Sequence, residues 1–388
     1  MSALAAERKG IDLWCAAAAA LSVVALLLPL GDGEGAPGWS DRPEAALNAV
    51  LLIVAGGWLA RRGANTAGIG ALLVAIVVLG CASCLGLLQG TPETGTLAGT
   101  AGPGFWAFVL ALWAAVWKGI DLIAGYRHIE RRRERLVELL VPAAFGLWLV
   151  FLWQVATVGF GVPQVLLPSP GLIAERFAGS LDILWADFQQ TFLKAVLAGY
   201  LLGCGSGFLV SILVDRVPFL QRGLLPLGNL VSALPIVGIA PIMVMWFGFD
   251  WQSKAAVVVI MTFFPMLVNT VTGLAAAGAL ERELMRSYAA GYWPTLFKLR
   301  LPAALPFIFN ALKINSTLAL IGAIVAEFFG TPIVGMGFRI STEVGRMNVD
   351  MVWAEIVVAA IVGSAFYGAM ALLERGFTFW HPSYRSKG

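Results

Sequence analysis

The sequence predicts an all-α membrane protein with about ten transmembrane helices. Of its 388 residues, 59% are hydrophobic and only 13% are charged, whereas about a quarter of an ordinary soluble domain is charged. The mean hydropathy is +0.83. The apolar residues come in runs of about twenty, which is the length of a helix that crosses a bilayer. A membrane β-barrel would instead show alternating segments of about ten residues.

The first four apolar runs predict an N-terminal membrane block, residues 1–126. They cover about 11–30, 44–60, 66–88 and 104–125. The first run has the length of a span and is followed by further spans, so we interpret it as a retained anchor and not as a cleaved signal peptide. This block carries no motif that assigns it a role.

A basic segment, residues 127–136 (RHIERRRERL), separates this block from the rest of the chain. It holds five Arg between positions 127 and 135, and we expect a cytoplasmic helix that links two membrane blocks. Two interpretations remain open for it. In the first, it is a solvated linker that sets the topology. In the second, its Arg side chains contact lipid headgroups or a partner protein.

A second membrane block, residues 137–388, contains six predicted spans. They cover about 137–159, 189–213, 224–247, 254–276, 304–329 and 350–373. A surface helix is expected to begin at Pro170, and Pro235 and Pro241 are expected to kink the span over 224–247.

The distribution of positive charge predicts the topology. With the N-terminus inside, eighteen Lys and Arg fall in cytoplasmic segments and five in outside segments. Because cytoplasmic loops are enriched in Lys and Arg, we expect both termini to be cytoplasmic. The polar loop over residues 277–303 would then also face the cytoplasm.

Within that loop, residues 283–302 read ELMRSYAAGYWPTLFKLRLP. The segment is basic and amphipathic and lies between two apolar spans, so it must lie outside the hydrocarbon. Leu284, Tyr288 and Trp293 are predicted to share one helical face, and Pro294 to limit the helix near its end. A membrane protein that presents such a helix to the cytoplasm has a partner to dock there.

This segment resembles the signature loop of the permease subunits of binding-protein-dependent ABC importers, in which Glu-Ala-Ala precedes a Gly and then Leu-Pro. Alignment on Leu301 and Pro302 places Glu283 at the family's Glu and Ala289 at its Gly. The family's two Ala positions hold Leu284 and Met285. Three further segments resemble this family, namely 302–330, 167–170 (LPSP) and 233–248 (ALPIVGIAPIMVMWFG). The likeness covers roughly residues 137–380 and points to the branch that carries sulfonates, nitrate, taurine, thiamine-precursor pyrimidines and riboflavin.

The resemblance implies a fold and a set of partners. The fold would be a six-helix type I permease core, here preceded by the four-helix N-terminal block. The partners would be two cytoplasmic ATPase subunits that bind ATP and Mg, a periplasmic substrate-binding protein, and a second permease core, as in a homodimer. The protein would reside in the bacterial inner membrane.

The resemblance also implies that residues about 283–295 form a coupling helix seated in the ATPase. Tyr288, Tyr292 and Trp293 would be contact anchors, and Glu283 and Arg286 would fix the orientation of the helix.

The chain shows no signature of an enzyme or of a bound cofactor. The phosphate-binding pattern GxxxxGK[ST] is absent from the sequence, so ATP hydrolysis would belong to a separate subunit. His128 and His381 lack neighbouring residues at metal-ligand spacing. Cys81 and Cys84 form a lone CxxC without a second pair. We therefore expect a transport subunit with no metal and no cofactor of its own.

Polar residues inside the predicted spans are the candidates for a translocation path. The candidates are Asn269, Lys313, Asn315, Thr317 and Glu327. Lys313 lies deep enough that it must face protein or water, either as the partner of another residue or as part of the path. The amides and hydroxyls either join helices or offer hydrogen bonds to a solute. Glu327 lies either at a periplasmic gate or at the membrane interface.

The expected function is passage of a small solute through an ATP-driven importer. The solute would be a pyrimidine or thiamine precursor, a riboflavin-like compound, or a sulfonate- or nitrate-type anion. The alternative is a secondary carrier or channel without ATP coupling. A secondary carrier predicts an internal repeat with ionisable residues at mid-membrane in both halves.

Overall fold

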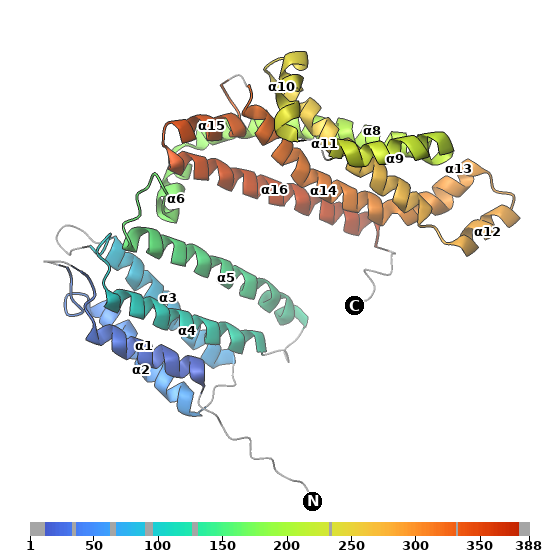
Figure 1. Ribbon diagram of the computed structural model, residues 1–388. Coiled ribbons are helices and arrows are strands. Elements are labelled where there is room, and N and C mark those ends of the chain that lie inside the picture. The colour runs from blue at the N-terminus through green and yellow to red at the C-terminus, as the bar shows by residue number, and fades with distance from the viewer. Residues whose placement is uncertain are drawn as a thin grey trace, which may run out of the picture. The chain divides into compact units, whose positions relative to one another are not determined.

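The computed structural model describes residues 12–32, 36–62, 67–89, 96–125, 131–232, 235–330 and 333–379. The regular elements among these residues are helices, accompanied by one isolated β-bridge between Gly31 and Ala101. The predicted all-α class is therefore confirmed (Figure 1). The chain divides into two compact units, Met1–Leu172 and Ile173–Gly388.

The first unit is a helical bundle around α4. Its helices are α1 (Leu13–Leu27), α2 (Pro43–Arg62), α3 (Ala67–Leu88), α4 (Pro103–Gly125) and α5 (Arg131–Gly159). The α4 helix packs against α1 and α3, and α2 packs against the same two helices. Phe105, Phe108 and Leu112 of α4 are fully buried at the centre. Burial of such side chains contributes about 1.5–3 kcal/mol each.

Helix α1 begins where the sequence supplies a cap. The Asp12 carboxylate accepts hydrogen bonds from the backbone N–H groups of Trp14 (3.2 Å) and Cys15 (3.3 Å), as an N-cap residue does. The same carboxylate pairs with Lys118 of α4 at 2.7 Å. One side chain thus starts α1 and joins it to α4.

Helix α5 packs with the first unit, against α3 and α4. The sequence had assigned residues 137–159 to the second block. The predicted basic linker, 127–136, overlaps the start of α5, because Arg131 is its first residue. Residues 127–130 lie outside the described part of the chain.

The second unit is built around α11. Its elements are α6 (Pro170–Gly179, which begins in the first unit), α7 (Leu181–Phe188), the π-helical segment η1 (Gln189–Val196), α8 (Leu197–Arg216), α9 (Pro218–Ser232), α10 (Ile236–Phe247), α11 (Trp251–Ala275), α12 (Ala279–Ser287), α13 (Tyr292–Thr295), the π-helical segment η2 (Leu296–Arg300), α14 (Leu301–Glu327), α15 (Met336–Gly345) and α16 (Val349–Phe377). Helix α11 packs against α8 on one side and α14 on another, and α16 packs against α14. The surface helix expected at Pro170 is present as α6.

Small residues allow α8 and α11 to approach closely. Gly199, Gly203 and Gly207 recur every four residues along α8 and are all buried. A side-chain carbon at Gly199 would lie 2.6 Å from the carbonyl oxygen of Ala255, and one at Gly207 would lie 2.6 Å from that of Phe263. Membrane helices pack through such small-residue rows because close backbone contact maximises van der Waals attraction.

Eight helices within the described residues are long and apolar enough to cross a membrane. Two of the ten expected spans take another form. The first apolar run is the fifteen-residue helix α1. The run over 224–247 is not one kinked helix but two, α9 and α10. Pro235 is the extended residue that precedes α10 (φ −69°, ψ 121°). Because Pro235 itself has an extended backbone, no continuous helix runs through it into α10.

Candidate functional site

The polar loop between α11 and α14 is a helix, a tight turn and a second helix. Helix α12 ends at Ser287, and Ala289 adopts the left-handed conformation with φ 52°. The Ala290 N–H donates to the Met285 carbonyl at 3.0 Å, and the Ala289 N–H donates to the Arg286 carbonyl at 2.9 Å. These two bonds form a Schellman motif, in which glycine is preferred at the left-handed position. The loop thus turns at the position aligned with the family's glycine, although this chain has alanine there.

The expected single helix over about 283–295 is therefore wrong. It ends at Ser287, seven residues before Pro294, and the chain restarts at Tyr292 as α13. From Tyr292 the chain runs through η2 directly into α14, so Leu301 and Pro302 stand at the first turn of α14. The left-handed turn at Ala289 is the physical cause, because it reverses the handedness of the backbone for one residue.

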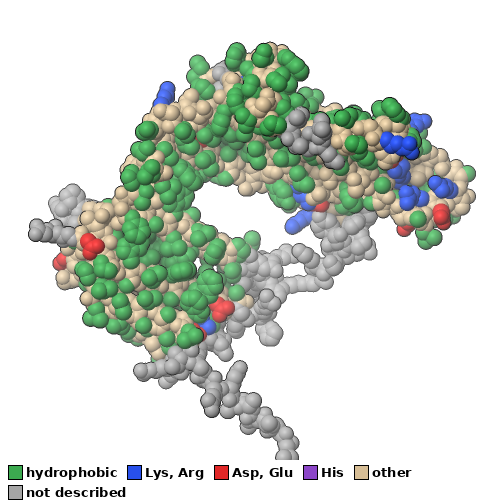
Figure 2. Space-filling view, viewed as in Figure 1, with side chains coloured by type: hydrophobic (Ala, Val, Ile, Leu, Met, Phe, Trp, Pro, Cys, Tyr) green, Lys and Arg blue, Asp and Glu red, His purple; other side chains and the backbone are tan. Residues whose placement is uncertain are grey.

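An exposed apolar stripe runs along α12. Leu280, Leu284 and Tyr288 are 78%, 56% and 78% exposed and follow one another at four-residue intervals. Glu283 and Arg286 are exposed on the same helix. Trp293, predicted to share this face, belongs to the next helix and stacks on Phe297 with ring centroids 5.9 Å apart. Figure 1 shows α12 projecting at the tip of the second unit, and Figure 2 shows Lys and Arg side chains gathered at that end.

An ion pair joins the base of this loop to α8. The Arg300 guanidinium donates to both carboxylate oxygens of Asp215, at 2.6 and 2.8 Å, and to the Leu274 carbonyl at the end of α11. The Tyr292 hydroxyl donates to the same carboxylate at 2.9 Å. The two charged side chains are only 17% and 9% exposed. We call Asp215, Tyr292 and Arg300 the loop clamp.

Aromatic contacts extend the loop clamp. The Arg216 guanidinium lies over the rings of Tyr292 (5.6 Å) and Trp293 (5.8 Å), distances at which cation–π attraction contributes. The end of α8 therefore contacts the start of α13 through two successive side chains. The loop clamp therefore joins α13 and η2 to the ends of α8 and α11.

Lys313 is paired inside the second unit. Its ammonium group lies 2.6 Å from the Glu374 carboxylate of α16, and the two side chains are 17% and 10% exposed. A charge within a membrane span requires such a partner. Of the two interpretations of Lys313, a paired residue or a path residue, the structure shows the pairing, with Glu374.

The other candidate path residues lie in different settings. Asn315 is fully buried and donates to the Thr262 carbonyl (2.8 Å) and the Cys204 sulfur (3.2 Å), so it joins α14 to α11 and α8. Asn269 is half-buried and donates to the Pro265 carbonyl of its own helix at 2.8 Å. Thr317 is exposed, and its hydroxyl donates to the Ile314 carbonyl. Asn315 is therefore enclosed within this unit, whereas the Thr317 side chain lies at its surface.

Glu327, at the far end of α14 from the loop clamp, is buried in a hydrogen-bonded network. It is 2% exposed. The Thr191 hydroxyl lies 2.8 and 3.0 Å from its two carboxylate oxygens, and the Gly337 N–H donates to it at 2.7 Å. The Thr191 oxygen also accepts from the Met336 N–H at 2.8 Å. Glu327 thus fixes α15 against η1.

Asp187 completes this network. It is fully buried and accepts from the Gly335 N–H at 2.6 Å and from Arg339 Nε at 2.8 Å. Gly335 has φ +138°, and a side-chain carbon there would lie 2.7 Å from the Glu327 carboxylate. Only glycine fits this position. Nearby, Gln190 donates to Asp250 at 2.8 Å, and this hydrogen bond, together with one from the Trp251 N–H, lowers the pKa of the Asp250 carboxyl.

Several of these residues were missed from the sequence. Asp187, Thr191, Asp215 and Glu374 lie at the edges of predicted spans, where polar residues are common. One signal could have found Glu374: a Lys deep in a span requires an acidic partner, and few acidic residues lie near the apolar runs.

Taken together, this architecture defines a multi-pass membrane protein with an exposed helical loop clamped to its spans. Residues 195–379 match the family described as the binding-protein-dependent transport system inner membrane component. The match lies within the second unit. The chain belongs to this family, the permease subunits of ABC importers, in the branch that includes sulfonate and thiamine-precursor systems.

Named relatives support this assignment. The chain is 32% identical over 248 residues to a riboflavin transport system permease protein of Chloroflexus aurantiacus, covering 63% of this chain and 90% of that protein. It is 31% identical over 247 residues to a formylaminopyrimidine transport permease protein of Halalkalibacterium halodurans, covering 64% and 98%. It is 31% identical over 249 residues to a putative aliphatic sulfonates transport permease protein of Bacillus subtilis, covering 63% and 88%.

Proposed function

We propose that this protein is the membrane subunit of an ATP-driven importer and that α12 seats in a cytoplasmic ATPase. The observation that carries the proposal is the apolar stripe of Leu280, Leu284 and Tyr288, which stands exposed on a helix outside the candidate spans. A stripe of this kind on a water-facing helix favours burial by a partner. Family membership supports an ATPase as that partner.

The loop clamp gives the proposal a mechanical basis. Closure of an ATPase dimer on ATP binding would move α12. The left-handed turn at Ala289 and the continuous run from Tyr292 into α14 would carry that movement into the spans. The Asp215–Arg300 pair would bring α8 and the end of α11 along, because it joins all of these elements. Hydrolysis would reset them.

The proposed topology places α12 and both chain termini in the cytoplasm of a bacterial cell. It is supported by the excess of Lys and Arg in the segments that would face inward. Glu327 and the α15 segment would then lie on the periplasmic side, where a substrate-binding protein delivers the solute. A second copy of this chain would complete the path.

We infer that the solute is uncharged or weakly polar. Four exposed residues of α14, Asn310, Ile314, Thr317 and Ile321, lie on one helical face, which we propose as the path wall. This face offers an amide and a hydroxyl. Lys313, the deep cation that an anion carrier would use, is paired with Glu374. The riboflavin and formylaminopyrimidine systems among the relatives are consistent with such a solute.

The test is co-purification of the tagged chain in mild detergent, comparing the wild type with a Glu283→Arg/Tyr288→Ala double variant. We expect a protein carrying the GxxxxGK[ST] pattern, identified by mass spectrometry, to accompany the wild type and to be lost from the variant. The matched control is Tyr367→Ala, which removes an exposed tyrosine from α16 and should leave the association unchanged.

Two results would overturn the proposal. One is the absence of an ATPase from wild-type material that unfolds cooperatively on heating. The other is equal recovery of the ATPase with the double variant. In either case transport without ATP coupling becomes the function to test.

A further inference from the structure

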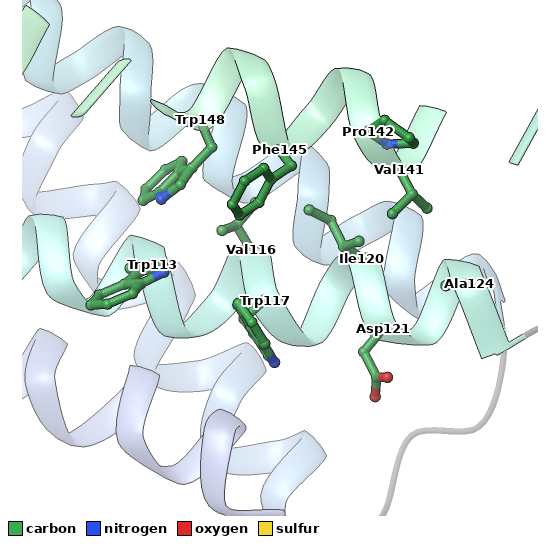
Figure 3. A pocket seen from close by; sticks show the side chains of 10 residues that line it. All are labelled: Trp113, Val116, Trp117, Ile120, Asp121, Ala124, Val141, Pro142, Phe145 and Trp148. Atoms are coloured by element: carbon green, nitrogen blue, oxygen red, sulfur yellow. The ribbon is translucent and has the colours of Figure 1, made fainter. Parts of the chain in front are cut away.

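Buried charged side chains set the second unit apart from the first. Among the described residues of the first unit, no Asp, Glu, Lys or Arg is buried. Its groove between α4 and α5 is lined by apolar side chains apart from Asp121 (Figure 3). In the second unit, by contrast, Asp187, Glu327 and Glu355 are 0%, 2% and 0% exposed. These three carboxyls also interact with one another.

Glu355, on α16, is the one carboxyl of the three that lacks a donor. Neither of its buried oxygens accepts a hydrogen bond from the described residues. Asp187 and Glu327 each accept at least two hydrogen bonds from N–H or O–H donors. A buried carboxylate that gives up water without gaining donors is very costly, because nothing replaces its hydration. The surroundings of Glu355 therefore favour the uncharged acid over the carboxylate.

The group that faces Glu355 is another carboxyl, that of Asp187. Leu184 of α7 packs in one apolar cluster with Met351 and Ala354 of α16. Asp187 follows Leu184 by three residues and Glu355 follows Met351 by four, so both carboxyls lie on the helix faces that meet. The Asp187 side chain lies within hydrogen-bonding reach of Glu355. Two ionised carboxylates are both acceptors and repel each other, so this contact requires a proton between them.

The charges around this contact balance only if one proton is bound. Five ionisable side chains form what we call the carboxyl network: Asp187, Lys254, Glu327, Arg339 and Glu355. Three carboxylates against two cations leave one negative charge in excess, which a water-poor interior disfavours. Three flanking pairs of opposite charge leave this count unchanged, namely Glu343 with Arg346, Asp350 with Arg176, and Asp250 with Lys194. No group among the described residues is arranged to hold a metal ion, so a proton is the cation that restores the balance.

We propose that Glu355 carries a proton at neutral pH, donates it to Asp187, and thereby latches α15 against α7 and α16. In this form Asp187 stays ionised and keeps its hydrogen bonds to the Gly335 N–H and to Arg339. When the proton leaves for the solvent, two adjoining carboxylates repel each other and weaken the hold on α15. The latch does not depend on whether α12 docks on an ATPase.

The first test is the infrared spectrum of the purified full chain in dodecylmaltoside, a detergent without carbonyl groups. A protonated carboxyl has a C=O stretching band that a carboxylate lacks. We expect such a band in the wild type at neutral pH and its loss in Glu355→Gln, which keeps the shape of the side chain and a donor towards Asp187. The matched control is Glu343→Gln, because Glu343 is also buried but already accepts from Arg346 and Asn348. This variant should keep the band.

The second test is hydrogen exchange of the amides of residues 335–337, each of which donates to a side chain beside α15. The pH is raised from about 6 to about 9, above the ordinary range of a Glu carboxyl, and the rates are corrected for intrinsic exchange. Because opening releases one proton, the opening constant of the wild type should rise by up to about tenfold per pH unit. In Glu355→Gln it should not change with pH.

Three results would overturn the latch. One is a Glu355→Gln spectrum that keeps the protonated-carboxyl band. Another is an equal dependence of exchange on pH in the wild type and in Glu355→Gln. The third needs no variant and therefore does not rely on the folding of one: corrected exchange of residues 335–337 in the wild type that is independent of pH.

Discussion

Removal of the Asp215 carboxylate should loosen the loop between α11 and α14 far more than removal of a comparable surface carboxylate. In Asp215→Ala, Arg300 loses two hydrogen bonds of 2.6 and 2.8 Å, and the Tyr292 hydroxyl loses one of 2.9 Å. Loss of one partner from a buried ion pair costs about 3–5 kcal/mol. Arg300 is 17% exposed and keeps its bond to the Leu274 carbonyl. We therefore expect a loss of about 2–3 kcal/mol.

The assay is thermal unfolding in nanodiscs, combined with hydrogen exchange over residues 279–300. A loss of this size corresponds to a fall in melting temperature of about 5–10 °C for a domain of 150–250 residues. Exchange of the amides of α12 and α13 should accelerate. The matched control is Asp350→Ala, because Asp350 pairs with Arg176 at 3.0 Å, with side chains 34% and 40% exposed. An exposed pair of this kind contributes at most about 1 kcal/mol.

The double variant Asp215→Leu/Arg300→Leu provides a second check. Replacement of both partners removes the uncompensated charge, so the double variant should be more stable than Asp215→Ala. If Asp215→Ala and Asp350→Ala lowered the melting temperature equally, the loop clamp would have no special role and the reasoning would fail.

Three further substitutions test the packing of the second unit. Ala289→Gly should raise the free energy of unfolding by about 1 kcal/mol, because an alanine with φ 52° is strained. Its control, Ala290→Gly, should lower the free energy of unfolding. Chemical denaturation measures both, and a stabilising Ala290→Gly would contradict the assigned turn. Gly207→Ala should lower the melting temperature by several degrees, because the new methyl group would collide with the Phe263 carbonyl. Gly205→Ala should be neutral or stabilising, because open space surrounds Gly205. Equal effects of the two substitutions on the melting temperature would refute the close α8–α11 contact. Glu374→Gln should destabilise by about 2–4 kcal/mol by leaving the Lys313 ammonium buried without its counter-ion, and Lys313→Met added to it should recover part of that loss in the same unfolding measurement. A double variant no more stable than Glu374→Gln would argue against the pair.

The helical class and most of the spans follow directly from the sequence. A run of about twenty apolar residues that crosses a bilayer has few structures open to it other than a helix, because its backbone N–H and C=O groups must hydrogen-bond within the segment. Two predicted helices were wrong at positions where a single residue determines the local backbone conformation. Pro235 marks a restart of the helix in place of a kink. At Ala289 the chain adopts a conformation that alanine disfavours, so local preference gave no signal of the turn.

The interactions of the candidate site depend on contacts that are distant in sequence. Asp215 and Arg300 are 85 residues apart, and Lys313 and Glu374 are 61 apart. Residue type alone identified Lys313 as costly within a membrane and Glu327 as a residue of a gate or of the interface, but it could not supply their partners. The exposed stripe of α12 was found in part, because Leu284 and Tyr288 share a helical face, whereas Trp293 lies beyond the turn.

The most direct test of the importer proposal is photo-crosslinking from position 284 in living cells of the native host. A photoreactive phenylalanine derivative in place of Leu284 should give one dominant crosslink to an ABC ATPase subunit, identified by mass spectrometry. The same probe in place of Leu147, a 72% exposed residue of α5 within a candidate span, should give no such product. If the probe at position 284 captured no ATPase at normal expression, or gave the same products as the probe at position 147, α12 would not be the coupling helix.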